Sequence, residues 1–104
     1  MTPLETLKAA RDLISDPARW TQGWFAKNER GLNVSEDHPD ACCWCVLGAM
    51  KRVSSSSIGF HQAAAILRNR SMFRLFDLSE FNDTHTHAEV LALFDAAIAE
   101  LEVV

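Results

Sequence analysis

Three cysteines that lie close together, Cys42, Cys43 and Cys45, are the side chains best suited to nucleophilic chemistry in this sequence. The surrounding apolar pattern predicts that they occupy the first turns of a helix, where unpaired N–H groups and the helix dipole lower a thiol pKa. Asp83 and His85 fall in a polar segment that could fold over this helix end. Cys45, His85 and Asp83 are therefore a candidate set of nucleophile, base and orienting carboxylate. A free cysteine in an apolar helix is also commonly a small buried side chain, and the sequence leaves both interpretations open.

The same segments offer the ligands of a zinc site. Cys42 and Cys45 have C-x2-C spacing, and His85 and His87 could complete a tetrahedral set. Against this interpretation, the two cysteines lie in a predicted apolar helix, and no glycine follows to form the usual tight knuckle. We therefore expect no bound cofactor and keep the four residues only as candidate ligands.

A third group of residues resembles a recognition surface more than a reaction centre. It combines aromatic and polar side chains from two irregular segments, namely Trp20, Gln22, Trp24, Phe81, Asn82 and Asp83. Tryptophan beside a Gln-Gly pair is typical of contact surfaces, which loops held by a rigid scaffold often provide. The alternative is that the tryptophans belong to the core and that Asn82 and Asp83 cap the helix that follows.

The elements that must position these residues are mostly helices. Thr2-Pro3-Leu4-Glu5 predicts a helix start with a capping box, and apolar residues continue at helical spacing to Ile14. Residues 24–27 and 32–34 predict two short strands around Gly31. Asp40 is the expected N-cap of a helix over residues 41–53 that is apolar on nearly every side and therefore central to the fold.

The second half of the chain continues the helical pattern. We expect a helix over residues 58–69, a short helix from Ser71 to Leu78 and a polar loop over 79–85. A second capping box, Thr86-His87-Ala88-Glu89, predicts the start of a last helix. The predicted fold is mainly α, a single small helical domain over residues 1–104. Four to five helices surround a buried central helix, and a small β-hairpin completes the domain.

Composition limits the classes of function. The chain has 104 residues and a net charge of -4, which argues against a general nucleic-acid binder, since such a protein needs a surplus of Lys and Arg. The longest apolar run, residues 41–50, is too short to cross a bilayer, so we expect no membrane association. The N-terminus lacks a signal-peptide pattern, which predicts a cytoplasmic location and free thiols.

Several short motifs resemble those of a known family. They are Trp20-x-Gln22-Gly23, Gly31, Trp44-Cys45-x-x-Gly48-Ala49, and Phe81-Asn82-Asp83 with Thr86 and Glu89-Val90. Their order and spacing are similar to those of an uncharacterised family of small bacterial and phage domains, known as a domain of unknown function. The family more often has tryptophan at the position of Phe81. The resemblance implies no reaction or ligand, while occurrence in phages and mobile elements would suggest an accessory or regulatory role.

We therefore expect a non-enzymatic, cytoplasmic interaction or regulatory module that binds another protein or itself. One alternative is a thiol- or zinc-dependent enzyme that uses Cys45 and residues 83–87. The other is a structural subunit that associates with itself through the last helix.

Overall fold

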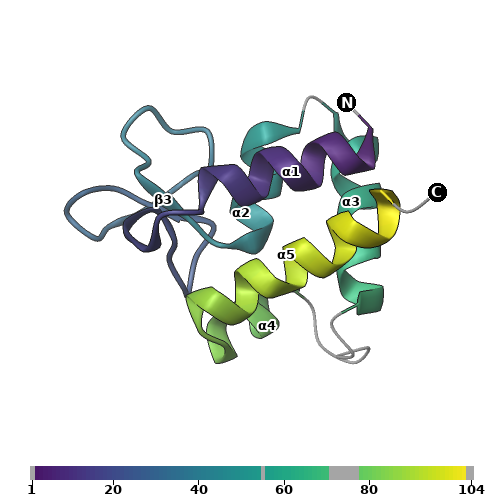
Figure 1. Ribbon diagram of the computed structural model, residues 1–104. Coiled ribbons are helices and arrows are strands. Elements are labelled where there is room, and N and C mark those ends of the chain that lie inside the picture. The colour runs from purple at the N-terminus through teal and green to yellow at the C-terminus, as the bar shows by residue number, and fades with distance from the viewer. Residues whose placement is uncertain (1, 55, 71–77, 103–104) are drawn as a thin grey trace.

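The computed structural model describes residues 2–54, 56–70 and 78–102 (Figure 1). Within these ranges the chain forms five α-helices, three two-residue strands and one short 3-10 turn. The elements are α1 (Pro3–Leu13), η1 (Pro17–Arg19), β1 (Ala26–Lys27), β2 (Asn33–Val34), β3 (Cys43–Trp44), α2 (Val46–Val53), α3 (Ser57–Arg70), α4 (Leu78–Thr84) and α5 (His87–Glu102). The sheet and its loops lie at one end of the helical body, and the start of α1 and the end of α5 lie at the opposite end (Figure 1). The predicted mainly helical fold is confirmed.

Both predicted capping boxes are present. At the start of α1, the Glu5 N–H donates to Thr2 Oγ1 (3.1 Å), and the Thr2 N–H donates to Glu5 Oε1 (2.9 Å). At the start of α5, the Glu89 N–H donates to Thr86 Oγ1 (3.2 Å), and the Thr86 N–H donates to Glu89 Oε1 (2.8 Å). These reciprocal bonds satisfy N–H groups that would otherwise lack partners at a helix start.

The central helix begins later than predicted. We expected it to start after Asp40, but residues 43–44 form β3 and the N-cap is Cys45. The reason is a competing partner: the Cys42 N–H donates to the Lys27 carbonyl (2.9 Å), and Trp44 pairs with Ala26 across the sheet. An apolar run fits a buried strand as well as a buried helix, so periodicity alone does not separate the two.

The predicted hairpin exists and gains a third strand. β1 pairs antiparallel with β2 on one side and with β3 on the other, in the order β2–β1–β3. Asn28 Oδ1 accepts the N–H groups of Arg30 and Leu32, both at 3.0 Å, and Gly31 has φ 77°. A short amide side chain and a left-handed glycine are what such a tight connection requires.

The segment that begins at Leu78 differs from the prediction. α3 itself was expected over 58–69 and is confirmed at Ser57–Arg70, while residues 71–77 of the expected short helix lie outside the described ranges. The expected polar loop over 79–85 is instead α4. Leu78, Phe81 and Asn82 are buried in this helix, so tertiary contacts stabilise a sequence whose polar composition favours a loop.

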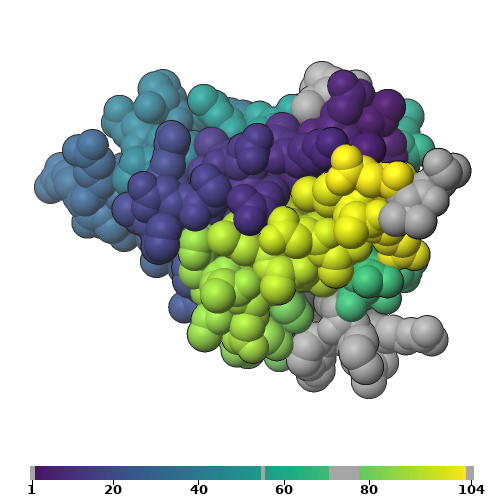
Figure 2. Space-filling view, viewed as in Figure 1, coloured from purple at the N-terminus to yellow at the C-terminus, as the bar shows by residue number. Residues whose placement is uncertain are grey.

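The core lies between α1, α2, α3 and α5. Its largest fully buried side chains include Leu7, Ile14, Met50, Leu67 and Phe94. Figure 2 shows α1 and α5 side by side along one face, where Arg11 Nε lies 2.7 Å from Asp95 Oδ1. No described helix has the length and apolar character needed to cross a membrane.

Candidate functional site

A single buried amide connects the irregular segment after α1 to α2 and α4. Asn82 is fully buried, and its Oδ1 accepts both the indole N–H of Trp20 (2.7 Å) and the backbone N–H of Val46 (3.1 Å). Its Nδ2 donates to the carbonyl of Thr21 (2.9 Å). Asn82 therefore supplies an acceptor to the first turn of α2 and holds the 20–21 backbone against α4.

The next residues extend this connection. Gln22 Nε2 donates to the carbonyls of Asn82 (3.0 Å) and His85 (3.1 Å). The Gly23 N–H donates to Asp83 Oδ1 (2.9 Å), which also accepts from Asn82 Nδ2 (3.2 Å). Gly23 has φ 87°, a conformation that glycine adopts without strain. Segment 20–23 is thus held to α4 by side-chain bonds at each end.

All six predicted contact residues lie in this region, but their exposures differ. Asn82 is fully buried, and Phe81 is 8% exposed. Trp20 and Gln22 are engaged in the bonds described above. Trp24 (47% exposed) and Asp83 present their side chains to solvent. Partner binding by these residues stays a prediction. The hydrogen bonds of Trp20, Gln22 and Asn82 help to position Trp24 and Asp83.

A hollow of about 180 Å³ lies beside Trp24. It is lined by Gly23, Trp24, Phe25, Cys45, Ser79 and Asp83. The rings of Trp24 and Phe25 meet edge to face with 5.9 Å between their centroids. Sequence reasoning missed Phe25 and Ser79, because Phe25 was assigned only to a strand and Ser79 to a loop.

Phe25 also approaches α2 through its backbone. The Cys45 N–H donates to the Phe25 carbonyl (3.2 Å). A Cβ added at Gly48 would overlap that carbonyl oxygen and would lie 2.7 Å from its carbon. Glycine at position 48 therefore allows the backbone of Phe25, a residue that lines the hollow, to pack directly against the first turn of α2. A packing role of this kind is common for a glycine inside a helix.

Cys45 differs from the activated thiol that the sequence allowed. It is 3% exposed, and its Sγ accepts the Gly48 N–H (3.3 Å) as the N-cap of α2. Burial raises the pKa of the Cys45 thiol above its ordinary value, and the charge of Asp83 adds to the rise, while hydrogen bonds from the Gly48 and Leu47 backbone oppose it. The prediction that this pKa is lowered is therefore wrong, because the rise caused by burial is larger than the lowering caused by the N–H groups at the helix start.

The two histidines make other contacts. His85 stacks on Phe81 with 3.9 Å between ring centroids, and its Nδ1 lies 2.8 Å from the Phe81 carbonyl oxygen. His87 Nε2 lies 2.7 Å from the carbonyl oxygen of Ile14. In the described ranges no three His, Cys, Asp or Glu side chains are grouped closely enough to hold a metal ion, so the structure does not bring Cys42, Cys45, His85 and His87 into one site.

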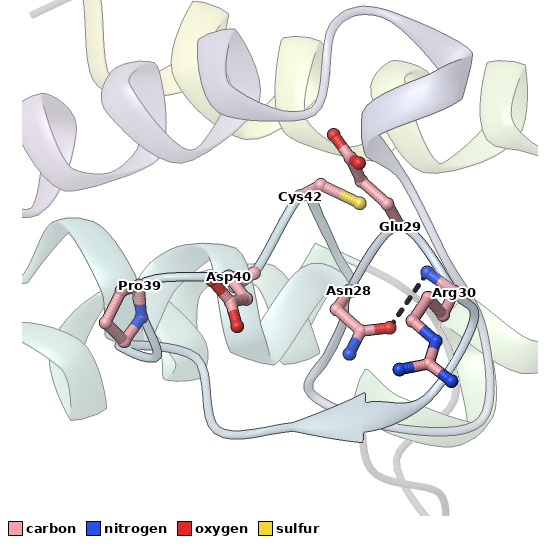
Figure 3. A pocket seen from close by; sticks show the side chains of 7 residues that line it. Asn28, Glu29, Arg30, Pro39, Asp40 and Cys42 are labelled. Atoms are coloured by element: carbon pink, nitrogen blue, oxygen red, sulfur yellow. Dashed lines mark hydrogen bonds between the residues drawn. The ribbon is translucent and has the colours of Figure 1, made fainter.

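Cys42 lines a separate and larger hollow of about 430 Å³ at the sheet end (Figure 3). The other lining residues are Asn28, Glu29, Arg30, Pro39, Asp40 and Ala41. Asn28 uses its carboxamide oxygen to close its own turn, as the dashed line to the Arg30 nitrogen in Figure 3 shows. The polar groups here are those of two solvated turns, and we place the candidate site at the Trp24 hollow.

A family model matches residues 1–100, and its description is a family of unknown function, DUF6197. The chain belongs to DUF6197. The resemblance drawn from the short motifs is confirmed, and the W-x-Q-G, W-C-x-x-G-A and F-N-D residues of this DUF6197 member lie in or beside the Asn82 network. Searches of curated proteins and of solved structures found no significant match.

Proposed function

We propose that this chain is a cytoplasmic protein-binding module and not an enzyme, with a contact surface centred on Trp24. We call this surface the Trp24 face; it consists of Trp24, the hollow beside it and the Asp83 carboxylate. The observation that carries the proposal is an exposed tryptophan on a segment that other side chains hold in place.

Exposure and immobilisation together favour binding. Trp24 is 47% exposed, whereas Trp44 is 3% exposed. Tryptophan is among the residues that contribute most to protein interfaces when a partner covers them. The bonds from Gln22 and Gly23 to α4 fix the segment before any partner arrives, which reduces the entropy lost on binding.

The thiol-enzyme alternative has less geometric support. Cys45 is buried with a raised pKa and acts as a helix cap, whereas a nucleophilic cysteine needs an accessible thiolate. The free state of all three cysteines fits the proposed cytoplasmic location.

Self-association through α5 also has less support. Val90, Leu93, Phe94 and Ala97 of α5 are buried in the core. The large exposed apolar side chains in the described ranges are Trp24, Leu32 and Ile58, none of them on α5. The exposed apolar side chains of α5, such as Ala92 and Ala99, are small and would bury little apolar area in a dimer.

Quantitative capture from cells that express the chain tests the proposal. Wild type, Trp24→Ala and Ile58→Ala serve as baits, since Ile58 is a more exposed apolar residue (70%) far along the sequence from this face. We expect a protein that is retained by wild type and Ile58→Ala and lost at least tenfold with Trp24→Ala. Identical captured sets for the three baits would overturn the proposal, provided that the melting temperatures agree.

A further inference from the structure

We propose that the Trp24 hollow binds a cationic side chain, the ammonium of lysine or the guanidinium of arginine, on the partner protein. This inference rests on the proposed function and specifies the chemistry that the Trp24 face recognises. Three observations support it, namely a fixed carboxylate, an exposed aromatic ring and the size of the hollow between them.

The carboxylate of Asp83 is held in place but is not neutralised. Its Oδ1 accepts from the Gly23 N–H and from Asn82 Nδ2, which fixes its orientation at the edge of the hollow. Five ion pairs with Lys, Arg or His in the described ranges use the carboxylates of Asp37, Asp40, Asp95, Glu100 and Glu102, and none of the five involves Asp83. Asp83 thus presents a preorganised negative charge to an incoming cation.

The aromatic ring of Trp24 supplies the second half of a cation site. A cation near the face of an indole ring is attracted by the negative potential of that face, and tryptophan is the strongest side chain in this respect. The neighbouring residue Phe25 already takes part in a cation–π contact, since Lys51 Nζ lies 4.6 Å from the centroid of its ring. The cation beside Phe25 comes from the same chain, whereas the exposed ring of Trp24 is available to a cation of a partner.

Size and charge limit the ligand. At about 180 Å³ the hollow has room for one flexible side chain but is smaller than the sites that usually enclose drug-sized molecules. The net charge of -4 favours the approach of a basic partner over an acidic one. A lysine or arginine side chain combines the required charge with an apolar stem that can lie along Trp24.

Amide chemical-shift titration of the full chain provides the test. The probes are N-acetyl-arginine amide and N-acetyl-lysine amide, each compared with a neutral counterpart, the citrulline and the Nε-acetyl-lysine derivatives. We expect saturable shifts of the Trp24 indole N–H and the Gly23 N–H with a Kd on the order of 1 mM for the cationic probes. The neutral probes should bind at least about fivefold more weakly, because they lack the charge–carboxylate interaction.

A matched pair of variants separates charge from structure. Asp83→Asn keeps an Oδ1 that can accept from Gly23 and removes only the negative charge, so the cationic probes should bind about tenfold more weakly. Asp12→Asn removes an exposed acid from α1 and should leave the Kd unchanged.

Equal affinity for the arginine and citrulline probes in wild type would overturn this inference, and that comparison requires no variant to fold. Unchanged affinity in Asp83→Asn would overturn it as well. The proposed function is judged separately by capture with Trp24→Ala. A captured partner without cation binding removes only the cation site, and cation binding without any captured partner removes the protein-binding function.

Discussion

At the scale of single residues, the Asn82 side chain provides hydrogen-bond partners for polar groups that no helix or sheet pairs. Three groups that lack partners in a helix or sheet, the Trp20 indole N–H, the Val46 N–H and the Thr21 carbonyl, all bond to its carboxamide. Buried polar groups without a partner are costly, so this one side chain allows an irregular segment to lie against the core.

Asn82→Ala is expected to lower the free energy of unfolding by about 3 kcal/mol, because it leaves several buried donors and acceptors without partners. Urea denaturation followed by tryptophan fluorescence, which reports on the segment that Asn82 holds, measures the change. Asn69→Ala, on the exposed surface of α3, is the control and should stay within about 0.5 kcal/mol of wild type. Equal losses in the two variants would show that the Asn82 network adds nothing to stability.

At the scale of helices and strands, the close packing of the Phe25 backbone against α2 explains why α2 contains Gly48. Helix propensity alone favours alanine over glycine by about 1 kcal/mol. At Gly48, however, the backbone of Phe25 occupies the position of a Cβ, with the carbonyl carbon at 2.7 Å and Cα at 3.1 Å. Backbone atoms held by β1 and by the Cys45 N–H cannot move aside as a flexible side chain would.

Gly48→Ala should therefore destabilise the protein by about 2 to 3 kcal/mol in spite of its better helix propensity. It should also shift the amide resonances of Phe25 and Trp24, since β1 must move away from α2. Thermal or urea unfolding gives the first result and an amide spectrum the second. Gly31→Asn is the control, because asparagine tolerates a positive φ and nothing lies within 4 Å of the added Cβ. A stabilised Gly48→Ala would contradict the close approach.

The capping box of α5 predicts a pH dependence. Hydrogen bonds from the Thr86 backbone and hydroxyl lower the pKa of Glu89 below its ordinary value. A carboxylate whose pKa is lower in the folded state stabilises the fold above its unfolded pKa of about 4.3 and loses that effect as the pH falls through the folded pKa. Glu89→Gln keeps an acceptor for the Thr86 N–H but does not titrate.

The melting temperature of Glu89→Gln should therefore lie slightly below that of wild type at pH 7, and the gap should close towards pH 3. Paired thermal melts at these two pH values measure it. A gap of constant size across this range would mean that the Glu89 charge makes no contribution to the cap.

Local sequence signals predicted the elements whose stability is local. The two capping boxes, the helix spacing of α3 and the Gly31 turn depend on residues a few positions apart, and all of them were found as expected. The start of α2 and the existence of α4 depend on partners far along the chain. Pairing with Ala26 and Lys27 makes residues 43–44 a strand, and burial of Leu78 and Phe81 stabilises a helix with polar composition.

The residue types pointed to most members of the candidate site, but not to Phe25 or Ser79 and not to the roles of the members. Residue types and motifs brought Trp20, Gln22, Trp24, Asn82 and Asp83 to attention, and the structure places them together. Which of them face inward is decided by contacts that span about sixty residues, such as Gln22 to Asn82. Periodicity carries no information about such pairs, so burial of Asn82 and exposure of Trp24 emerge only from the fold.

At the scale of the whole molecule, the Asn82 network joins two parts that differ in architecture. The sheet end contains all three tryptophans, Trp20, Trp24 and Trp44, and the chain has no tyrosine, so its intrinsic fluorescence reports on this end alone. Far-UV circular dichroism is dominated by the helices. Fluorescence thus reports on unfolding of the sheet end, and circular dichroism reports on unfolding of the helices.

We expect the two signals of wild type to give one urea midpoint, because Trp20 and Thr21 bond to Asn82 on α4 and the Phe25 backbone lies against α2. In Asn82→Ala the sheet end loses its main attachment to α4, while the core between α1, α2, α3 and α5 stays intact. Fluorescence should then report unfolding at a lower urea concentration than circular dichroism does. Coincident midpoints in Asn82→Ala, both shifted equally, would mean instead that packing of β1 and β3 on α2 suffices to couple the two parts.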